Sequence, residues 1–86
     1  MSDFRLKVFL SVAKNLSFTK ASQELFVSQP AITKHIQELE TCYQARLFDR
    51  QGNKISLTEA GKNIVKRYWR IINGWNMKCI YSIMNI

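Results

Sequence analysis

Serine residues at helix-capping positions divide the first half of this chain into short helices, and this division restricts the possible folds more than any other feature. Ser17 and Ser28 each stand just before a stretch with helical periodicity. A serine hydroxyl in that place accepts a hydrogen bond from a free backbone N–H of the first turn. Ser2 is predicted to cap a first helix that ends near Lys14. The sequence therefore predicts a second helix over residues 18–26 and a tight turn that leads into a third helix at Ser28.

The third predicted helix has two different faces. Its apolar residues recur at spacings of 4, 3 and 4, which places one stripe toward a core: Ile32, Ile36, Leu39 and Tyr43. Pro30 lies in the first turn, where a missing N–H has no helical partner to lose. The opposite face carries small or polar side chains and no acid before Glu38: Gln29, Pro30, Thr33, Lys34, Gln37 and Thr41.

A hairpin and a fourth helix are predicted after this face. Gly52 and Asn53 form a turn signal between short apolar segments, and Arg50 and Lys54 flank the tip. Thr58 is predicted to cap a helix over residues 58–73. That helix carries a heptad seam, expected to be a dimer interface, formed by Ile64, Tyr68, Ile71 and Trp75. Residues 74–86 form an apolar tail without clear periodicity.

The charge of the chain indicates a polyanionic partner. The formal net charge is +7 and the isoelectric point is near 9.8, which favours nucleic acid first and a membrane surface second. Simple solubility is the alternative explanation. The chain contains no signal-peptide pattern and no apolar run long enough to cross a membrane. Cys42, Cys79 and the single His35 provide no zinc-ligand spacing, so we expect a reduced cytoplasmic protein without metal, cofactor or catalytic activity.

Two short helices joined by a tight turn and followed by a basic hairpin predict a mainly α fold. This fold is a winged helix-turn-helix, with residues 1–57 as the domain and a C-terminal linker helix. Phosphates repel carboxylates, so the helix end that enters a DNA groove should lack acids. The predicted base or phosphate contacts are Gln29, Thr33, Lys34 and Gln37, with Arg50 and Lys54 reaching a minor groove or the backbone. An ordinary solvated face is the competing interpretation.

Two hypotheses concern the remaining charged side chains of the third helix. Glu38 and Glu40 lie in its second half, where they oppose the helix dipole, and a pair with Arg46 would compensate for this. His35 lies beside the apolar stripe, so a packing role is expected for it rather than a base contact.

The segments SFTKAS, SQPAIT, LE, LF-R and LTEAG occur in an order and spacing that resemble the N-terminal DNA-binding domain of LysR-type transcriptional regulators. The resemblance covers about residues 4–72. It implies a winged helix-turn-helix, a bacterial origin and a fourth helix that dimerises. By position, it also implies recognition-helix contacts, phosphate contacts at the second helix and a wing contact. Combined with the candidates from the polar face and the hairpin, these positions give the expected DNA-binding set: Thr19, Lys20, Ser28, Gln29, Pro30, Thr33, Lys34, Gln37, Arg50 and Lys54.

The sequence also departs from the family pattern. His35 stands where the family usually has Gln, and Tyr43-Gln44 replaces the usual Leu-Gly. Family members continue into an effector-binding domain, so no small-molecule effector is expected for this chain. Our prediction is sequence-specific binding of double-stranded DNA by a homodimer. Two alternatives remain: a dimerisation fragment that disables a full-length regulator, and a basic peptide that binds a membrane surface through the apolar tail.

Overall fold

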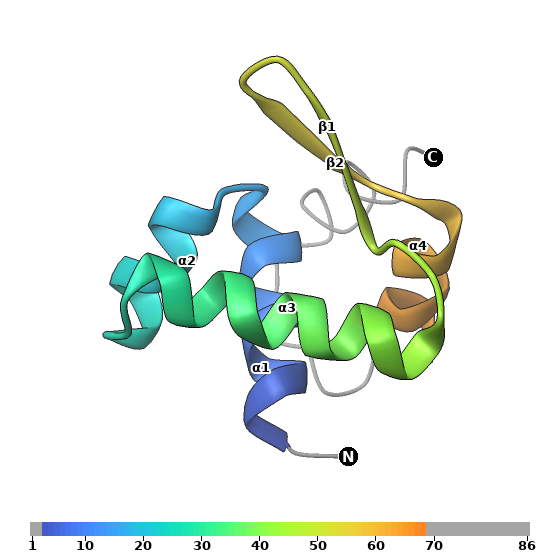
Figure 1. Cartoon of the computed structure of the whole chain (residues 1–86), viewed down its shortest axis with the longest axis horizontal. Helices are drawn as coiled ribbons and strands as arrows, with labels where there is room; N and C mark the ends of the chain where they lie inside the picture. Colours follow the sequence, from blue (N-terminus) through green and yellow to red (C-terminus); the bar gives the residue numbers. More distant parts are fainter. Residues whose placement is uncertain (1–2, 69–86) are drawn as a thin grey trace.

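Four helices and one β-hairpin make up residues 3–68, the part of the chain that this computed structural model describes (Figure 1). The fold is mainly α with a two-stranded wing, as the sequence predicted. The predicted fourth helix over residues 58–73 is shorter in the structure, because α4 ends at Arg67 and Tyr68 follows it as the C-cap. The predicted cap Ser2, residues 69–73 and the 74–86 tail lie outside the described residues. The elements are α1 (Asp3–Asn15), α2 (Phe18–Leu25), α3 (Gln29–Tyr43), β1 (Phe48–Gln51), β2 (Lys54–Leu57) and α4 (Glu59–Arg67).

The three predicted caps within the described residues are present. The hydroxyl oxygens of Ser17, Ser28 and Thr58 accept hydrogen bonds from backbone N–H groups three residues later, at 3.0, 3.2 and 3.1 Å. Each cap satisfies one of the free N–H groups that begin a helix. The serine spacing therefore determines where α2 and α3 start, and with them the tight turn between these two helices.

Three helices end in left-handed residues that are not glycine, and Leu16 follows α1 with φ 48°. Phe26 follows α2 with φ 57°, and its side chain is 93% exposed. Gln44 follows α3 with φ 52°, and its N–H donates to the carbonyls of the last turn. A left-handed residue is least strained as glycine. This geometry gives a physical reason for the Gly that the family usually has where this chain has Gln44.

The core forms around α1, which packs against both α2 and α3. Val8, Phe9 and Val12 of α1 are completely buried. They meet Ala21 of α2 and Ile32 of α3, which are equally inaccessible to solvent. Burial of this apolar surface is the main term that stabilises so small a domain.

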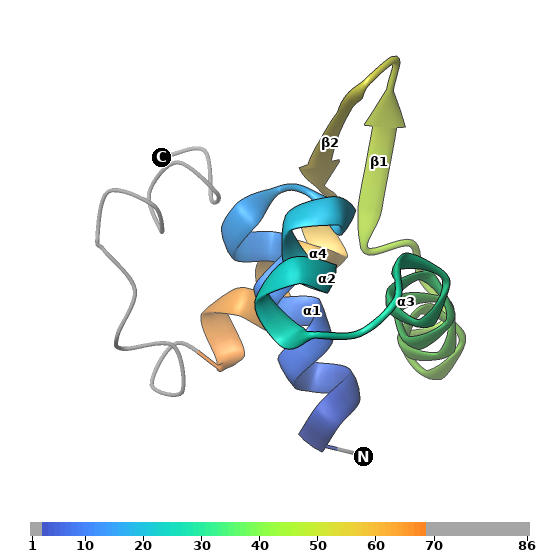
Figure 2. The same ribbon diagram turned by 90° about the vertical axis from the view of Figure 1, so that its left-hand side faces the viewer.

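The hairpin projects from the helical part of the molecule, as Figure 2 shows. Its strands pair antiparallel, with Phe48 opposite Leu57 at the root and Gln51 opposite Lys54 near the tip. Phe48 is buried, and its ring lies 5.4 Å from the ring of Phe9. The wing is therefore anchored in the core at its root and exposed at its tip.

A polar group of contacts joins α1 to α2. The buried Ser11 hydroxyl donates to Glu24 Oε1 at 2.8 Å, and Lys14 Nζ lies 2.8 Å from Glu24 Oε2. The hydrogen bond between Lys14 and Glu24 is the largest factor that lowers the pKa of Glu24. The fold therefore favours the ionised form of this carboxylate, and a lysine already compensates its charge.

Gly61 lets α4 lie directly against the root of the wing. A Cβ atom at this position would overlap the carbonyl oxygen of Leu47 and stand 2.7 Å from Leu57 Cδ2. Because the first of these neighbours is backbone, it cannot rotate away. Gly61→Ala is expected to lower the free energy of unfolding by about 1–3 kcal/mol, the usual effect of overpacking.

Chemical denaturation of this variant beside Asn63→Ala measures the effect. Asn63 is exposed on the same helix, so its substitution should change stability by less than about 0.5 kcal/mol. Equal stability of Gly61→Ala and the parent chain would contradict the close approach of α4 to Leu47.

Candidate nucleic-acid interface

The polar face of α3 points to solvent, as its sequence predicted. Gln29, Pro30, Lys34 and Gln37 are exposed and Thr33 is half-buried. The opposite stripe faces the core, with exposed fractions of 0% for Ile32, 3% for Ile36 and 1% for Leu39. The first turns of α2 and α3 contain no acid, so the positive ends of both helix dipoles are uncompensated. These ends attract anions such as phosphates.

Side chains from the starts of α2 and α3 meet. Gln29 Nε2 donates a hydrogen bond to Thr19 Oγ1 at 3.1 Å, across the turn between the two helices. Lys20, next to Thr19, is exposed. The structure thus brings residues assigned to two different kinds of DNA contact into one continuous surface.

A groove of about 310 Å³ separates α3 from the wing. The guanidinium carbon of Arg50 lies 4.8 Å from the centroid of the Phe18 ring, so a cation–π contact holds the wing arginine beside α2. Lys54 is exposed near the tip of the hairpin and does not line the groove. The lining residues are Phe18, Thr33, Ile36, Gln37, Glu40, Arg46, Phe48 and Arg50.

Sequence reasoning missed two members of this groove. Phe18 was assigned only to a helix, although its ring supports Arg50. Arg46 was considered only as a partner for an acid, although it lines the groove and donates weakly to the Phe48 carbonyl at 3.4 Å. No local sequence pattern signals either role, because both depend on how β1 folds back toward α2.

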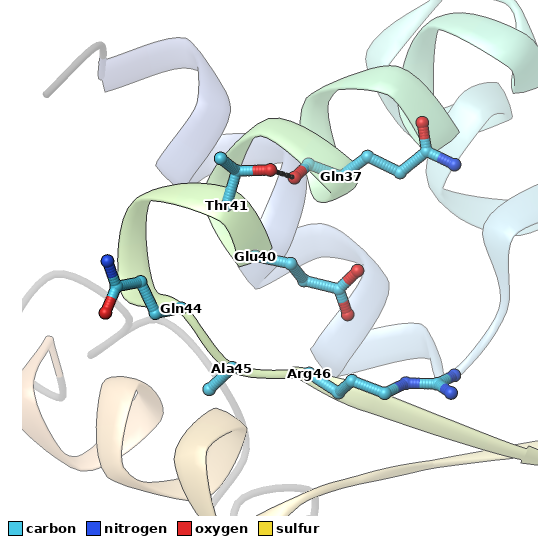
Figure 3. Close-up of a pocket in the computed structure, with 6 residues that line it drawn as sticks. All are labelled: Gln37, Glu40, Thr41, Gln44, Ala45 and Arg46. Carbon is cyan, nitrogen blue, oxygen red and sulfur yellow. Dashed lines mark hydrogen bonds between the residues drawn. The ribbon is translucent and has the colours of Figure 1, made fainter.

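The hypothesis that Glu38 or Glu40 pairs with Arg46 is wrong. Glu40 Oε2 instead accepts the backbone N–H of Leu47 at 2.8 Å. Figure 3 shows the Glu40 and Arg46 side chains extending on the same side of the link between α3 and β1, but within residues 3–68 they form no ion pair. A backbone donor close to α3 satisfies this carboxylate without an arginine.

His35 has the packing role that its position predicted. Its ring meets Phe4 of α1 edge-on, with centroids 5.2 Å apart. Its Nδ1 lies 3.5 Å from Glu38 Oε1, but this buried nitrogen has no aligned hydrogen-bond partner. His35 therefore joins α3 to α1 chiefly through its ring.

The structure describes only two of the four residues in the predicted dimer seam, and both pack against their own domain. Ile64 is 5% exposed and belongs to the core of its own domain, which leaves little of its side chain for a partner. Tyr68 is half-buried and packs at the edge of that core near Tyr43. The pKa of Tyr43 is raised, chiefly by burial of its hydroxyl and to a smaller extent by the nearby Tyr68. Ile71 and Trp75 lie outside the described residues.

The described part of the chain contains neither a metal-ligand cluster nor a membrane-spanning helix. Across residues 3–68, no three His, Cys, Asp or Glu side chains are grouped closely enough to hold a metal ion. No helix in the same range combines the length and the apolar character that crossing a bilayer requires. The Cys42 thiol is free and exposed.

Comparison with known sequences identifies a family. Residues 4–62 match the family described as bacterial regulatory helix-turn-helix protein, lysR family. An uncharacterized HTH-type transcriptional regulator from Azotobacter vinelandii is 44% identical over 68 residues, which are 79% of this chain and 47% of that protein. The HTH-type transcriptional regulator CitR from Bacillus subtilis is 36% identical over 74 residues, 85% of this chain and 25% of CitR. The chain thus spans less than half the length of these relatives.

Solved structures give the same result. A transcriptional regulator of the LysR family from Eggerthella lenta superimposes with a TM-score of 0.77 at 38% identity, covering 80% of this chain and 99% of that one. The CbnR DNA-binding domain in complex with DNA superimposes with a TM-score of 0.76 at 36% identity, covering 85% and 84%. The shared winged helix-turn-helix, the matched segment and the exposed face of α3 lead to one conclusion: this chain belongs to the LysR family of transcriptional regulators, and residues 4–62 match its DNA-binding domain.

Proposed function

We propose that this chain binds double-stranded DNA and distinguishes between sequences, with α3 in the major groove and the wing beside the adjacent backbone or minor groove. The observation that carries this proposal is the groove between α3 and β1, because Thr33 and Gln37 of the polar face line it together with Arg50 of the wing. Side chains of this kind form the hydrogen bonds that read base edges and hold phosphates. The related CbnR domain was solved in complex with DNA, which supports DNA binding by this chain.

The candidate residues fall into two proposed roles. Residues on the outer side of α3 contact base edges, and Lys34 is the only cation among them. The other residues position the domain on the phosphate backbone, where sequence is not read directly. The proposed base-contacting residues are Gln29, Pro30, Thr33, Lys34 and Gln37, and the proposed backbone contacts are Thr19, Lys20, Ser28, Arg50 and Lys54.

We also propose that the chain acts as a homodimer. The heptad spacing of Tyr68, Ile71 and Trp75 continues the line of Ile64 beyond the domain core and gives each copy an apolar seam. Helix-turn-helix dimers read two half-sites about one helical turn of DNA apart, so pairing would double the contacted sequence.

A fragment that only pairs with a full-length regulator is the competing function. It would need the seam but not the polar face of α3, whereas DNA recognition needs both. The two functions therefore differ in their sensitivity to substitution of Lys34.

Lys34→Ala is expected to weaken binding to a selected duplex by about 1–3 kcal/mol, with a smaller loss on random duplex. The physical reason is that a base contact is lost only on the correct sequence, while a phosphate contact is lost on all sequences. Selection of bound sequences from a random pool supplies the specific duplex. Titrations at several salt concentrations then separate the two kinds of loss.

Lys7→Ala is the matched control, because Lys7 is an exposed lysine on α1. It removes the same charge away from the polar face and should leave the ratio of specific to random binding unchanged. Equal losses on both duplexes for Lys34→Ala would make Lys34 a phosphate contact. The absence of any DNA binding by the parent chain would favour the pairing fragment.

A further inference from the structure

We infer that Glu40 is a positioning residue for DNA recognition, and that it sets the wing at a defined distance from α3. This inference rests on the proposed function, because its consequence is the placement of Arg50 opposite Thr33 and Gln37. Glu40 is the one acid among the residues that line the groove. A carboxylate there repels phosphates, so its contribution has to come from something other than direct attraction to DNA.

Glu40 forms hydrogen bonds with three of the residues that link α3 to β1. Its backbone carbonyl accepts hydrogen bonds from the N–H groups of Gln44 and, at 3.1 Å, Ala45. Its side-chain Oε2 accepts the N–H of Leu47 at 2.8 Å. Leu47 is completely buried, so without the carboxylate this N–H would lose its partner away from water. Glu40 thus accepts hydrogen bonds from three N–H groups of the link, and Figure 3 shows its side chain beside this link.

The position of Leu47 is transmitted to Arg50 through a short strand. The Leu47 carbonyl accepts the N–H of Thr58 at 3.1 Å, which holds both strands of the wing at the root. Side chains two residues apart on a strand point to the same face, so Phe48 and Arg50 share one face of β1. Both contact Phe18: the ring of Phe48 lies 6.0 Å from it and the guanidinium of Arg50 lies 4.8 Å from it. A displacement at Leu47 would therefore move Arg50 relative to α3.

The negative charge of Glu40 should weaken DNA binding, whereas the length of its side chain should strengthen binding by positioning the wing. Two substitutions separate these effects. Glu40→Gln keeps the length and an acceptor oxygen for Leu47 but removes the charge. It is expected to keep the ratio of specific to random binding and to bind all duplexes as tightly as the parent or more tightly. Glu40→Asp keeps the charge but is one methylene shorter. It is expected to weaken binding to selected and random duplexes alike by roughly tenfold, because the backbone contact of Arg50 is displaced.

A double-mutant cycle tests whether Glu40 acts through the wing. In the Glu40→Asp background, Arg50→Ala should cost less than it does in the parent, because Arg50 is already displaced. Lys34→Ala should cost the same in both backgrounds, because α3 itself is unchanged. A general loss of stability would not produce this selective coupling to Arg50.

Hydrogen exchange of the Leu47 amide provides a measurement that does not depend on DNA. The amide should be protected in the parent and in Glu40→Gln, and should exchange faster in Glu40→Asp. If the parent binds no duplex selectively, the proposed function fails, while this measurement still tests the contact between Glu40 and Leu47.

Four outcomes would overturn the positioning role. The first is a Glu40→Asp variant that keeps both the DNA affinity of the parent and the protected amide. The second is additivity of the Glu40 and Arg50 substitutions. The third is a Glu40→Gln variant that prefers a different base at one position, since Glu40 would then read a base itself. If Glu40→Asp does not fold, Glu40→Ala replaces it in the cycle, and failure of both to fold would also reject the inference in favour of a purely structural role.

Discussion

Ile36→Asp is expected to abolish the folded state. Ile36 is 3% exposed and lies in the stripe of α3 that faces the core, between Ile32 and Leu39. An aspartate at this position would place a carboxylate among apolar side chains, with no hydrogen-bond donor in that stripe. Burial of an unpaired charge costs several kcal/mol or forces its protonation. Small domains are stable by only about 5–15 kcal/mol, so the variant should lose its cooperative melting transition.

The neighbouring residue offers a matched control for this prediction. Gln37 is exposed on the opposite face, so Gln37→Asp adds the same acid one position further along the same helix. This variant should fold and melt like the parent, but should bind DNA more weakly because its carboxylate faces the phosphates. Circular dichroism during heating and a DNA titration distinguish the two effects. A cooperative transition in Ile36→Asp would show that α3 does not bury this face.

Loss of the dimer is expected to have the largest effect on DNA affinity. Ile71→Lys/Trp75→Lys places two cations in the proposed seam of each copy, and like charges across a coiled-coil core prevent pairing. A monomer binds one half-site instead of two and so loses avidity. Linked binding events of this kind typically contribute about 100-fold or more to affinity, so operator binding should fall by roughly that factor. Each domain is expected to remain folded, which circular dichroism of the double variant checks.

Sedimentation at several protein concentrations measures the mass of the parent and of the double variant. The parent should show a mass that rises with concentration, and the double variant should remain monomeric. Ile64→Lys is unsuitable for this purpose, because Ile64 belongs to the domain core and a lysine there would disturb folding. A parent that stays monomeric, or a double variant that still pairs, would locate the interface elsewhere.

The elements of this fold could be predicted from the sequence because their signals are local. The hydroxyls of Ser17, Ser28 and Thr58 contact N–H groups only three residues away, so their hydrogen bonds depend on nothing beyond the adjacent turn. The periodicity of Ile32, Ile36 and Leu39 likewise determines which side of α3 is buried, whatever it packs against. The exposed polar face follows by exclusion, and most of the candidate DNA contacts follow from that face.

Contacts between elements that are distant in the sequence could not be predicted from such local signals. Ile64 fits a heptad seam in the sequence, but α4 turns toward its own domain and buries this residue in the core. Glu40 has a nearby arginine in the sequence, but the path of the link places the Leu47 N–H at its carboxylate instead. In both cases the side chain had more than one possible partner, and its spacing along the chain did not distinguish between them.

The sequence by itself determined where α2, α3 and α4 begin, the turn between α2 and α3, the acid-free face and the family. The tertiary structure alone decided how that face is completed: Thr19 meets Gln29, and Phe18 supports Arg50 beside the groove. The physical reason is the range of the interactions. Caps and amphipathic periods act within one or two turns, whereas the position of the wing depends on the angle at which packed elements meet. Gly61 shows this dependence, because only the approach of α4 to the Leu47 carbonyl requires a residue without a side chain there.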